Sequence, residues 1–340
     1  MPPIVSYAQR FEDLYLLRCF GDRQDGFYID IGAGHPVYDN VSFAFYLRGW
    51  RGITVEPNPH LSRLARAVRP RDSHHQAVVG AAVGTARFYL VRDFHGLSTT
   101  IAGNADAALA QFGKASQEIE VPATTLRALC EQHAPGAIDF LKVDVEGTEA
   151  EVLRGGDWQR FRPKIVVAEA LAPYTLAPAW ETFEPFLAGH GYRYVWFDTL
   201  NRYYLAQEAA DLERNFTSAP TGFPDAVQFR DTRRALVDPQ HPDYRLAGLV
   251  ATAAMTRLPL FEPDLLLELT TADFAPADLA RVATKADLDT AFDRLFGAYP
   301  GTGEGLDPGR PETVRELYAR IISSDRFRIA CGRISASYAW

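Results

Sequence analysis

Four acidic residues that follow or end apolar runs are the best candidates for chemistry in this sequence: Asp30, Glu56, Asp144 and Glu169. Each run has the length of a short buried strand. In an open α/β sheet, ligands bind beyond the carboxyl ends of the strands. The sequence therefore predicts that the four carboxylates meet in one cleft at one edge of a central sheet.

The first of these acids, Asp30, precedes a turn that contains Gly32 and Gly34. Glycines let a ligand approach the backbone closely, so this is a candidate nucleotide-binding turn. It differs from the dinucleotide motif G-x-G-x-x-G, because Val37 stands where the third glycine would be. An acid here repels a pyrophosphate and suits a ligand with an amino group, such as the methionine portion of S-adenosylmethionine. An ordinary strand-to-helix turn is the alternative.

Glu56 follows the next expected strand, residues 51–55, about one βαβ unit after Asp30. A carboxylate at this place can accept hydrogen bonds from both ribose hydroxyls of a nucleotide. Together the two acids strengthen the prediction of a cofactor site. The alternative is that Glu56 belongs to a capping network for a helix at 59–69.

Asp144 and Glu169 follow or end two strands, 138–143 and 163–169, that we expect to be adjacent and parallel. Such a pair of carboxylates can bind a divalent metal ion, or one of them can act as general base towards an acceptor hydroxyl. Alternatively, Asp144 only shapes the cofactor pocket and Glu169 is a supporting or capping residue. His35 is a second candidate base, with stabilisation of its turn as the alternative.

The N-terminal segment is predicted to be a helix over residues 5–20 with Ser6 as N-cap. Gln9, Glu12 and Asp13 would lie together on this helix. They would form either a lid over the cofactor or a solvated helix face.

The elements that position these residues form an alternating α/β series, which predicts a mostly parallel sheet. A hairpin formed by 191–197 and 202–205 ends the series. The other expected strands are at 27–31, 51–55, 74–79, 86–91, 118–121, 138–143 and 163–169, and the expected helices at 5–20, 42–48, 59–69, 125–133, 148–154 and 180–190. Residues 92–104 are expected to be a polar loop that either borders the acceptor pocket or only connects two elements.

The sequence changes in character after Ala206. Residues 207–245 are rich in turn residues and are predicted to be a linker. Residues 246–340 show helical patterns without a catalytic constellation. We therefore expect three parts: a catalytic domain at 1–206, the linker, and a helical accessory domain that serves oligomerisation or partner recognition.

Charge and cysteine content restrict the protein class. The net charge of −8 argues against affinity for nucleic acid or for anionic membranes. The three cysteines, Cys19, Cys130 and Cys331, form no metal-ligand pattern and leave an odd thiol, which favours a reducing cytoplasm. Neither a signal peptide nor a membrane-spanning stretch is expected.

Several segments, in the right order, resemble the FkbM-type methyltransferases. These are residues 6–13, 28–36, 49–59 and 139–147, together with 96–99, 162–169 and 200–204. The resemblance covers roughly residues 5–206. It implies a class I methyltransferase fold, S-adenosylmethionine as donor, and O-methylation of a hydroxyl, commonly on a sugar or polyketide. It further implies that Asp30, Gly32 and Gly34 line the methionine portion and that Glu56 binds the ribose.

We therefore expect an S-adenosylmethionine-dependent O-methyltransferase acting on a small-molecule or glycan acceptor. The expected cofactor-binding residues are Gln9, Asp30, Gly32, Ala33, Gly34, Glu56, Pro57 and Asn58. Asp144, Glu169 and His35 are the catalytic candidates, and Asp144 with Glu169 would hold Mg²⁺ or Mn²⁺ if the reaction uses a metal. The alternatives are an NAD-dependent oxidoreductase and a non-catalytic cofactor-binding or scaffold protein.

Overall fold

The computed structural model of the chain describes residues 4–91, 95–216 and 226–229. The chain divides into two compact units, and the first of them, residues 1–66 with 70–228, contains the fold described below. The accessory helices expected from the sequence after residue 245 lie outside the described residues.

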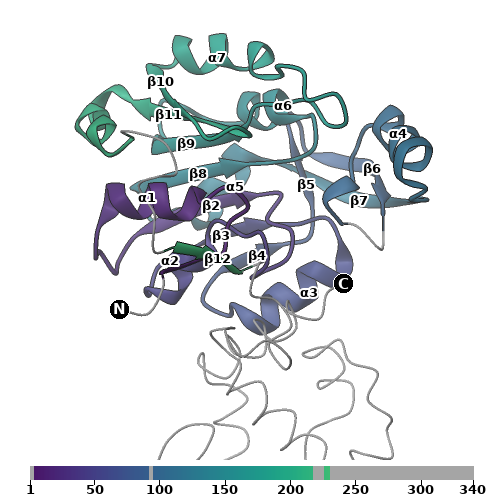
Figure 1. Cartoon of the computed structure of the whole chain (residues 1–340), viewed down its shortest axis with the longest axis horizontal. Coiled ribbons are helices and arrows are strands. Elements are labelled where there is room, and N and C mark those ends of the chain that lie inside the picture. The colour runs from purple at the N-terminus through teal and green to yellow at the C-terminus, as the bar shows by residue number, and fades with distance from the viewer. Residues whose placement is uncertain (1–3, 92–94, 217–225, 230–340) are drawn as a thin grey trace, which may run out of the picture. The chain divides into compact units, whose positions relative to one another are not determined.

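A mixed sheet forms the centre of this unit (Figure 1). Within the described residues its seven strands are, in spatial order, β10 (Tyr192–Phe197), β11 (Asn201–Ala206), β9 (Pro163–Glu169), β8 (Ile138–Val143), β2 (Phe27–Ile31), β3 (Arg51–Val55) and β4 (Ser73–His75). The strands from β9 to β4 run parallel, while β11 is antiparallel to β9 and to β10. This confirms the predicted mostly parallel sheet with a late antiparallel hairpin.

Helices cover both faces of the sheet. They are α1 (Glu12–Phe20), α2 (Phe43–Leu47), α3 (Pro59–Val68), α5 (Leu126–His133), α6 (Glu149–Arg154) and α7 (Glu184–Gly189). Because side chains alternate along a strand, Tyr28 and Phe140 join the apolar core under α1 and α2. Ile29 and Leu141 join the opposite core, to which α5, α6 and α7 contribute. The central strands β2, β3, β8 and β9 are mostly apolar because both faces are covered.

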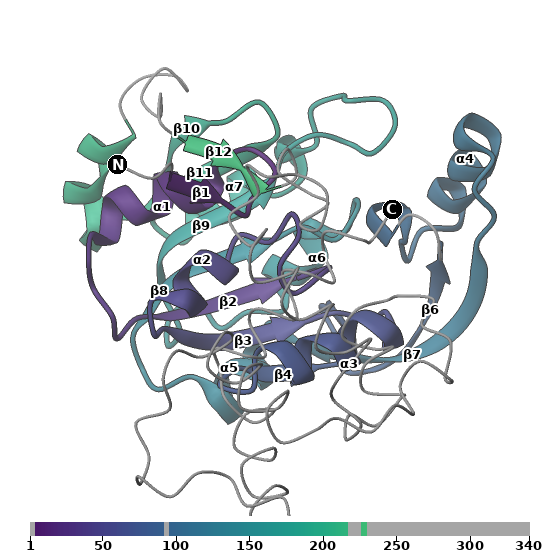
Figure 2. The same cartoon turned by 60° about the horizontal axis from the view of Figure 1, so that its bottom comes forward.

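A second, smaller sheet lies to one side of the central one (Figure 2). It consists of β5 (Val78–Gly80), β7 (Gln117–Thr125) and β6 (Gly84–Leu90), and the helix α4 (Ala102–Phe112) follows β6 in the chain. The loop expected at 92–104 therefore ends in the first turn of a helix. The short 3-10 turn η1 (His95–Leu97) precedes that helix.

The N-terminal segment differs from the predicted helix. Residues Ile4–Ser6 form a strand, β1, that pairs in parallel with β12 (Ala226–Gln228), and α1 begins only at Glu12. The Ser6 hydroxyl donates a 2.6 Å hydrogen bond to Asp13, which also accepts one from the Tyr7 N–H at 2.7 Å. Asp13 thus folds the strand back onto the helix. The 3-10 segment η3 (Gln207–Asn215) lies where the linker was expected.

Candidate active site

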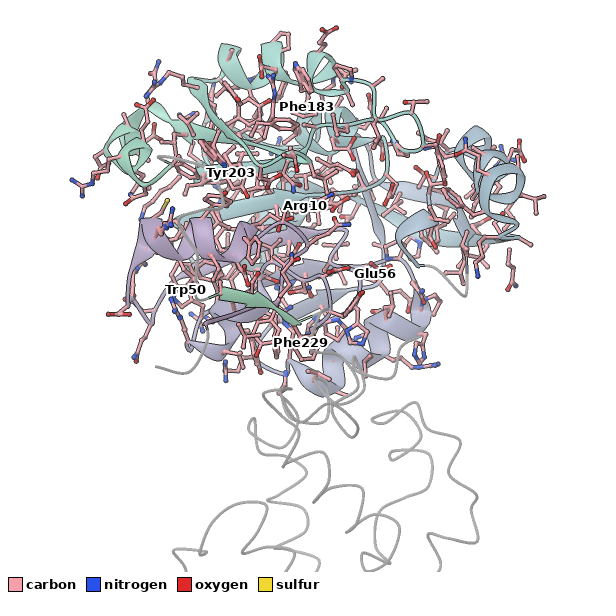
Figure 3. The ribbon with its side chains drawn as sticks, in the orientation of Figure 1. Arg10, Trp50, Glu56, Phe183, Tyr203 and Phe229 are labelled. Carbon is pink, nitrogen blue, oxygen red and sulfur yellow. The ribbon has the colours of Figure 1, made fainter. Side chains whose placement is uncertain are left out.

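The order in which the chain adds strands to the sheet reverses at β2. From β2 the chain adds β3 and β4 on one side and later β8 and β9 on the other, which makes the β2–β8 boundary a topological switch point. Trp50 and Glu56 mark the two ends of β3 in Figure 3, so the carboxyl edge is the one near Glu56.

The predicted acids do converge at this edge. Asp30 pairs in register with Lys142 of β8, and the Asp144 N–H donates a 3.0 Å hydrogen bond to the carbonyl of Ile31. Burial is the main cause of the raised pKa of Glu56, and the carboxylates of Asp30 and Asp144 are both close enough to add to it. Asp144 in turn raises the pKa of Glu169, after the larger effect of burial.

The glycine turn after β2 allows a very close contact between strands. Gly32 has a φ of +75° and its N–H donates to the carbonyl of Val55 at 3.0 Å. A Cβ atom at this position would lie 1.7 Å from the backbone oxygen of Asp144. A glycine is therefore required here to bring the ends of β2 and β8 together. Beside it, the carbonyl of buried Ala33 accepts a hydrogen bond from Asn40 at 2.9 Å.

Asp30 is buried and is held by the start of α2. The Ser42 hydroxyl, at the N-cap position of that helix, donates a 2.5 Å hydrogen bond to Asp30 Oδ2. The same hydroxyl lies 3.1 Å from Asn40 Oδ1, which also accepts from the Phe43 N–H. The orientation of this carboxylate is thus fixed by packed neighbours before any ligand arrives.

Glu56 closes the glycine turn from the side of β3. Its Oε2 accepts the Gly34 N–H and its Oε1 accepts the Asn58 N–H, both at 2.8 Å. Burial raises the pKa of Glu56 to about 7, against the opposing effect of these two hydrogen bonds. Each carboxylate oxygen carries a second lone pair that can accept a ligand hydroxyl.

The helix-capping alternative for this segment also has support. Asn58 is buried, and its Oδ1 accepts the N–H groups of His60 at 3.0 Å and Leu61 at 3.4 Å at the start of α3. Pro57, between Glu56 and Asn58, is half-buried. The amide oxygen of Asn58 therefore caps the helix, and its amide nitrogen is the group that it can offer to a cofactor.

His35 is buried next to the glycine turn. Its Nδ1 accepts hydrogen bonds from the N–H groups of Val37 at 3.2 Å and Tyr38 at 3.1 Å. These are the contacts expected of the turn-stabilising alternative. They require Nδ1 to be unprotonated, so any exchangeable proton of the neutral ring is on Nε2.

The N-terminal residues approach the site from the loop before α1. The carbonyl of half-buried Gln9 accepts a hydrogen bond from the side chain of Gln228 at 2.6 Å. Gln9 lies before α1 and is not part of the helix predicted for it from the sequence. Glu12 is buried at the first position of α1, and its Oε1 accepts a 2.9 Å hydrogen bond from Asn201. Burial, reinforced by the charge of Asp198, raises the pKa of Glu12 to about 8.

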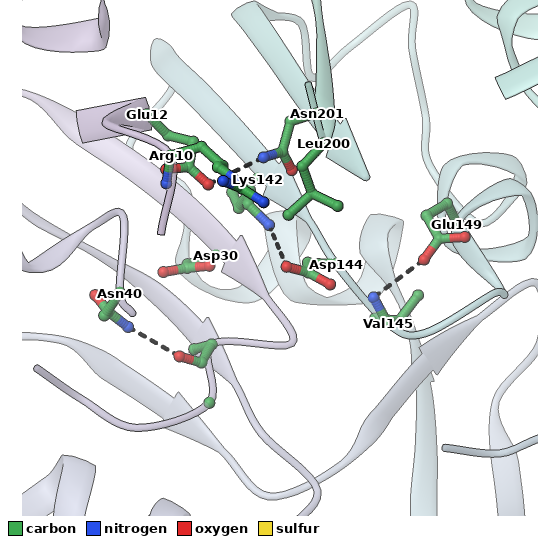
Figure 4. A network of polar contacts seen from close by, with 12 residues as sticks. Arg10, Glu12, Asp30, Asn40, Lys142, Asp144, Val145, Glu149, Leu200 and Asn201 are labelled. Carbon is green, nitrogen blue, oxygen red and sulfur yellow. Dashed lines mark hydrogen bonds and ion pairs between the residues drawn. The ribbon is translucent and has the colours of Figure 1, made fainter. Parts of the chain in front are cut away.

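A lysine not singled out from the sequence lies at the centre of the acids. Lys142 is buried on β8, and its Nζ lies 2.7 Å from Asp144 Oδ2 (Figure 4). Burial alone would lower the pKa of Lys142, but the charges of Asp144, Glu12 and Asp30 raise it, so the lysine stays charged. The sequence could have indicated this contact. Lys142 stands two residues before Asp144, and residues two apart along an extended chain point to the same side of it.

Glu146 is a second residue that the sequence analysis missed. Carboxylate oxygens of Asp144, Glu146 and Glu169 all lie within 4.8 Å of one another. Oxygen ligands at this spacing suit a divalent cation. Glu149, which follows them, is engaged differently: its Oε1 accepts the N–H groups of Val145 and Gly147 at 3.1 Å.

The segment that leads into α4 reaches this acidic cluster. Asn104 Nδ2 and the Thr99 hydroxyl both donate to the backbone carbonyl of Glu146, at 3.0 and 3.3 Å. The Phe112 ring, more than half exposed, lies 6.1 Å from the ring of Tyr174, and Glu146 raises the pKa of that tyrosine after the effect of burial. Thr99 and Asn104, at the C-terminal end of the segment expected to be a loop, thus lie next to the acidic cluster, and the role of this segment at an acceptor pocket stays a prediction.

None of the helices within the described residues combines the length and apolar character needed to cross a bilayer. Neither the curated proteins nor the solved structures gave a match to this chain. The model of the family described as "Methyltransferase FkbM domain" matches residues 30–194, which include Asp30, Glu56, Asp144 and Glu169. Residues 30–194 of this chain therefore belong to the FkbM methyltransferase family.

Proposed function

We propose that this protein is an S-adenosylmethionine-dependent O-methyltransferase that methylates a hydroxyl of a sugar or glycan. The observation that carries the proposal is the pairing of Asp30 and Glu56 around one glycine turn, with the Gly34 N–H bonded to Glu56, inside an FkbM-family domain. This arrangement offers one acid to an amino group and another to a ribose within a short distance.

The β2–β3 side of the edge would bind the donor. Asp30 would face the cationic amino group of the methionine portion, since Ser42 already orients its carboxylate. Glu56 would accept the ribose hydroxyls. Further cofactor contacts would come from the glycine turn, the N-terminal loop and the start of α3. These residues are Gln9, Gly32, Ala33, Gly34, Pro57 and Asn58. When bound, the cofactor would supply a methyl group on a sulfonium sulfur, and the neutral thioether that remains after transfer is a good leaving group.

The β8–β9 side would position the acceptor. Transfer of a methyl group is an in-line displacement, which needs alignment of the acceptor oxygen and removal of its proton. Asp144 or Glu169 would orient and deprotonate that hydroxyl, directly or around Mg²⁺ or Mn²⁺. His35 was the secondary candidate for the base, but its Nδ1 accepts two backbone N–H groups and the neutral ring then carries its proton on Nε2, so the arrangement favours its turn-stabilising role.

The cellular setting follows from weaker signals. Cys19 and Cys130 are free thiols in the described structure, which is compatible with the reducing cytoplasm expected from the sequence. We place the reaction there, with a small-molecule or glycan acceptor. Residues 246–340 would serve contacts with a second copy or with another partner.

Isothermal titration separates this proposal from an NAD-dependent oxidoreductase. We expect S-adenosylmethionine to bind and NAD not to bind. A screen with labelled donor against bacterial nucleotide sugars and glycans, with and without EDTA, then identifies the acceptor. Donor binding without turnover on any pool would favour a non-catalytic protein, and unchanged activity in both Asp144→Ala and Glu169→Ala would reject their assigned role.

A further inference from the structure

Among the described residues, the acids on the β8–β9 side carry more negative charge than their neighbours balance. Three carboxylates, from Asp144, Glu146 and Glu169, have oxygens within 4.8 Å of one another. Lys142 lies against this group, and its Nζ contacts Asp144 Oδ2 at 2.7 Å. One ammonium cannot neutralise three carboxylates at this spacing, because like charges so close repel strongly.

Glu169 gives an independent sign that a ligand belongs here. Glu169 is only 9% exposed, and its Oε2 has no hydrogen-bond partner among the described residues. A buried carboxylate oxygen without a partner is costly, since it has lost its water and gained nothing in return. A cation among the three side chains would satisfy this oxygen.

The backbone of Glu146 is arranged to present its side chain to the cluster. Glu146 has a φ of +57°, which is rare for a residue with a side chain, and the following Gly147 has a φ of +110°. The two hydrogen bonds from Thr99 and Asn104 to the Glu146 carbonyl hold this conformation. Residues kept in such conformations by their surroundings concentrate at ligand sites.

We propose that Asp144, Glu146 and Glu169 together bind one divalent cation, with Glu146 as a full ligand. Three carboxylates without a histidine or cysteine form a hard, all-oxygen donor set, which suits Mg²⁺, Mn²⁺ or Ca²⁺ rather than Zn²⁺. Glu149 is not among the three residues whose carboxylate oxygens lie within 4.8 Å of one another, and its Oε1 is turned to two backbone N–H groups, so we leave it out of the ligand set. Only the role of the ion rests on the proposed function: it would polarise the acceptor hydroxyl.

Mn²⁺ binding to the purified full chain tests the site without donor or acceptor. We expect electron paramagnetic resonance titration to show one tightly held Mn²⁺ per chain, and Mg²⁺ to displace it. Glu146→Gln and Glu169→Gln should each weaken binding about tenfold or more, since each removes one anionic ligand. Glu151→Gln is the matched control, because Glu151 is an exposed acid on α6 that pairs with Arg154.

A melting curve recorded with and without Mn²⁺ shows whether the variants fold. The wild type and the Glu151→Gln variant should melt at a higher temperature with Mn²⁺, and the two ligand variants should fold but respond much less. Absence of Mn²⁺ binding by the wild type, or equal binding by Glu146→Gln and Glu151→Gln, would overturn the site. Methyl transfer that survives EDTA would remove the assigned role of the ion and leave the methyltransferase proposal intact, whereas Mn²⁺ binding without donor binding would reject the methyltransferase proposal alone.

Discussion

On the β2–β3 side of the carboxyl edge, Asp30 and Glu56 accept hydrogen bonds from a serine hydroxyl and from two backbone N–H groups. On the β8–β9 side, oxygens of Asp144, Glu146 and Glu169 lie within 4.8 Å of one another, and one oxygen of Glu169 has no hydrogen-bond partner in the described part of the chain. The carboxylates on the two sides thus differ in their surroundings. Hydrogen-bond donors stabilise those on the β2–β3 side, whereas those on the β8–β9 side repel one another.

The difference shows which half of the site is complete before ligands bind. Carboxylates whose hydrogen bonds are already made keep their geometry, as a preorganised binding site requires. Carboxylates that repel one another are stabilised only when a cation or a protonated partner arrives. We therefore expect the geometry of the β2–β3 side, the proposed donor side, to be the same with and without ligand. The stability of the β8–β9 side, the proposed acceptor side, should depend strongly on nearby charge.

The largest effect should come from the contact that joins the two halves. In Gly32→Ala the new Cβ would lie 1.7 Å from the Asp144 backbone oxygen, and φ is +75°. We expect a loss of at least about 4 kcal/mol of unfolding free energy, measured by chemical denaturation. Gly103→Ala is the control: apart from the adjacent residues and the backbone of its own helix, no atom lies within 4 Å of the added Cβ, and in helix α4 the alanine should stabilise by up to about 1 kcal/mol. Equal stability of the two variants would contradict the close-contact argument.

The next largest effect should fall on the acceptor side. Lys142→Met leaves the crowded carboxylates without their buried ammonium, and we expect it to cost about 3 kcal/mol, at the low end of the range because the Asp144 side chain stays 29% exposed. Lys164→Met is the matched control. Its partner Asp139 also pairs with Arg23 at 2.6 Å, so the loss there should stay below about 1 kcal/mol. Urea denaturation at neutral pH without divalent cations measures both. A smaller loss in Lys142→Met than in the control would show that the acids are not repelling one another.

The buried strands and most of the helices of this fold could be predicted from sequence, whereas helix α4 and the strands β1 and β12 could not. The apolar runs at Arg51–Val55 and Pro163–Glu169 define β3 and β9 at the residues expected, because strands covered on both faces are apolar throughout. Helix α4 was missed because it buries little: Ala105 and Ala108 are buried, while Phe112 is exposed. The β1–β12 pair joins three-residue segments far apart in the chain, which no local pattern reports.

The candidate site was predictable where it depends on strand ends and unpredictable where it depends on backbone conformation. The sequence predicted four of its acids, because each stands at or just after the end of an apolar run: Asp30, Glu56, Asp144 and Glu169. Glu146 joins them only because its φ is positive, and a sequence that reads Glu-Gly does not specify that turn.

The pH dependence of donor binding sharpens the comparison further. Burial raises the pKa of Glu56 to about 7, with Asp30 and Asp144 adding to the rise, so the carboxylate becomes protonated as the pH falls below 7. A protonated Glu56 accepts ribose hydroxyls poorly. We expect the Kd for S-adenosylmethionine to be about tenfold larger at pH 6 than at pH 8, by isothermal titration. Glu56→Gln should bind weakly at both pH values, and a wild-type Kd that does not change with pH would reject the assigned role of Glu56.

The smallest effect should distinguish helix capping from cofactor contact on the donor side. Asn58→Ala removes the oxygen that accepts the His60 and Leu61 N–H groups, so we expect it to cost about 1 kcal/mol of stability. The Kd for S-adenosylmethionine should rise less than in Glu56→Gln, because Asn58 can offer the cofactor only its amide nitrogen. Asn58→Asp serves as control, since it keeps the capping oxygen and should restore the stability while removing that amide. A rise in Kd as large as that of Glu56→Gln in both Asn58 variants would instead make the amide nitrogen a principal cofactor contact.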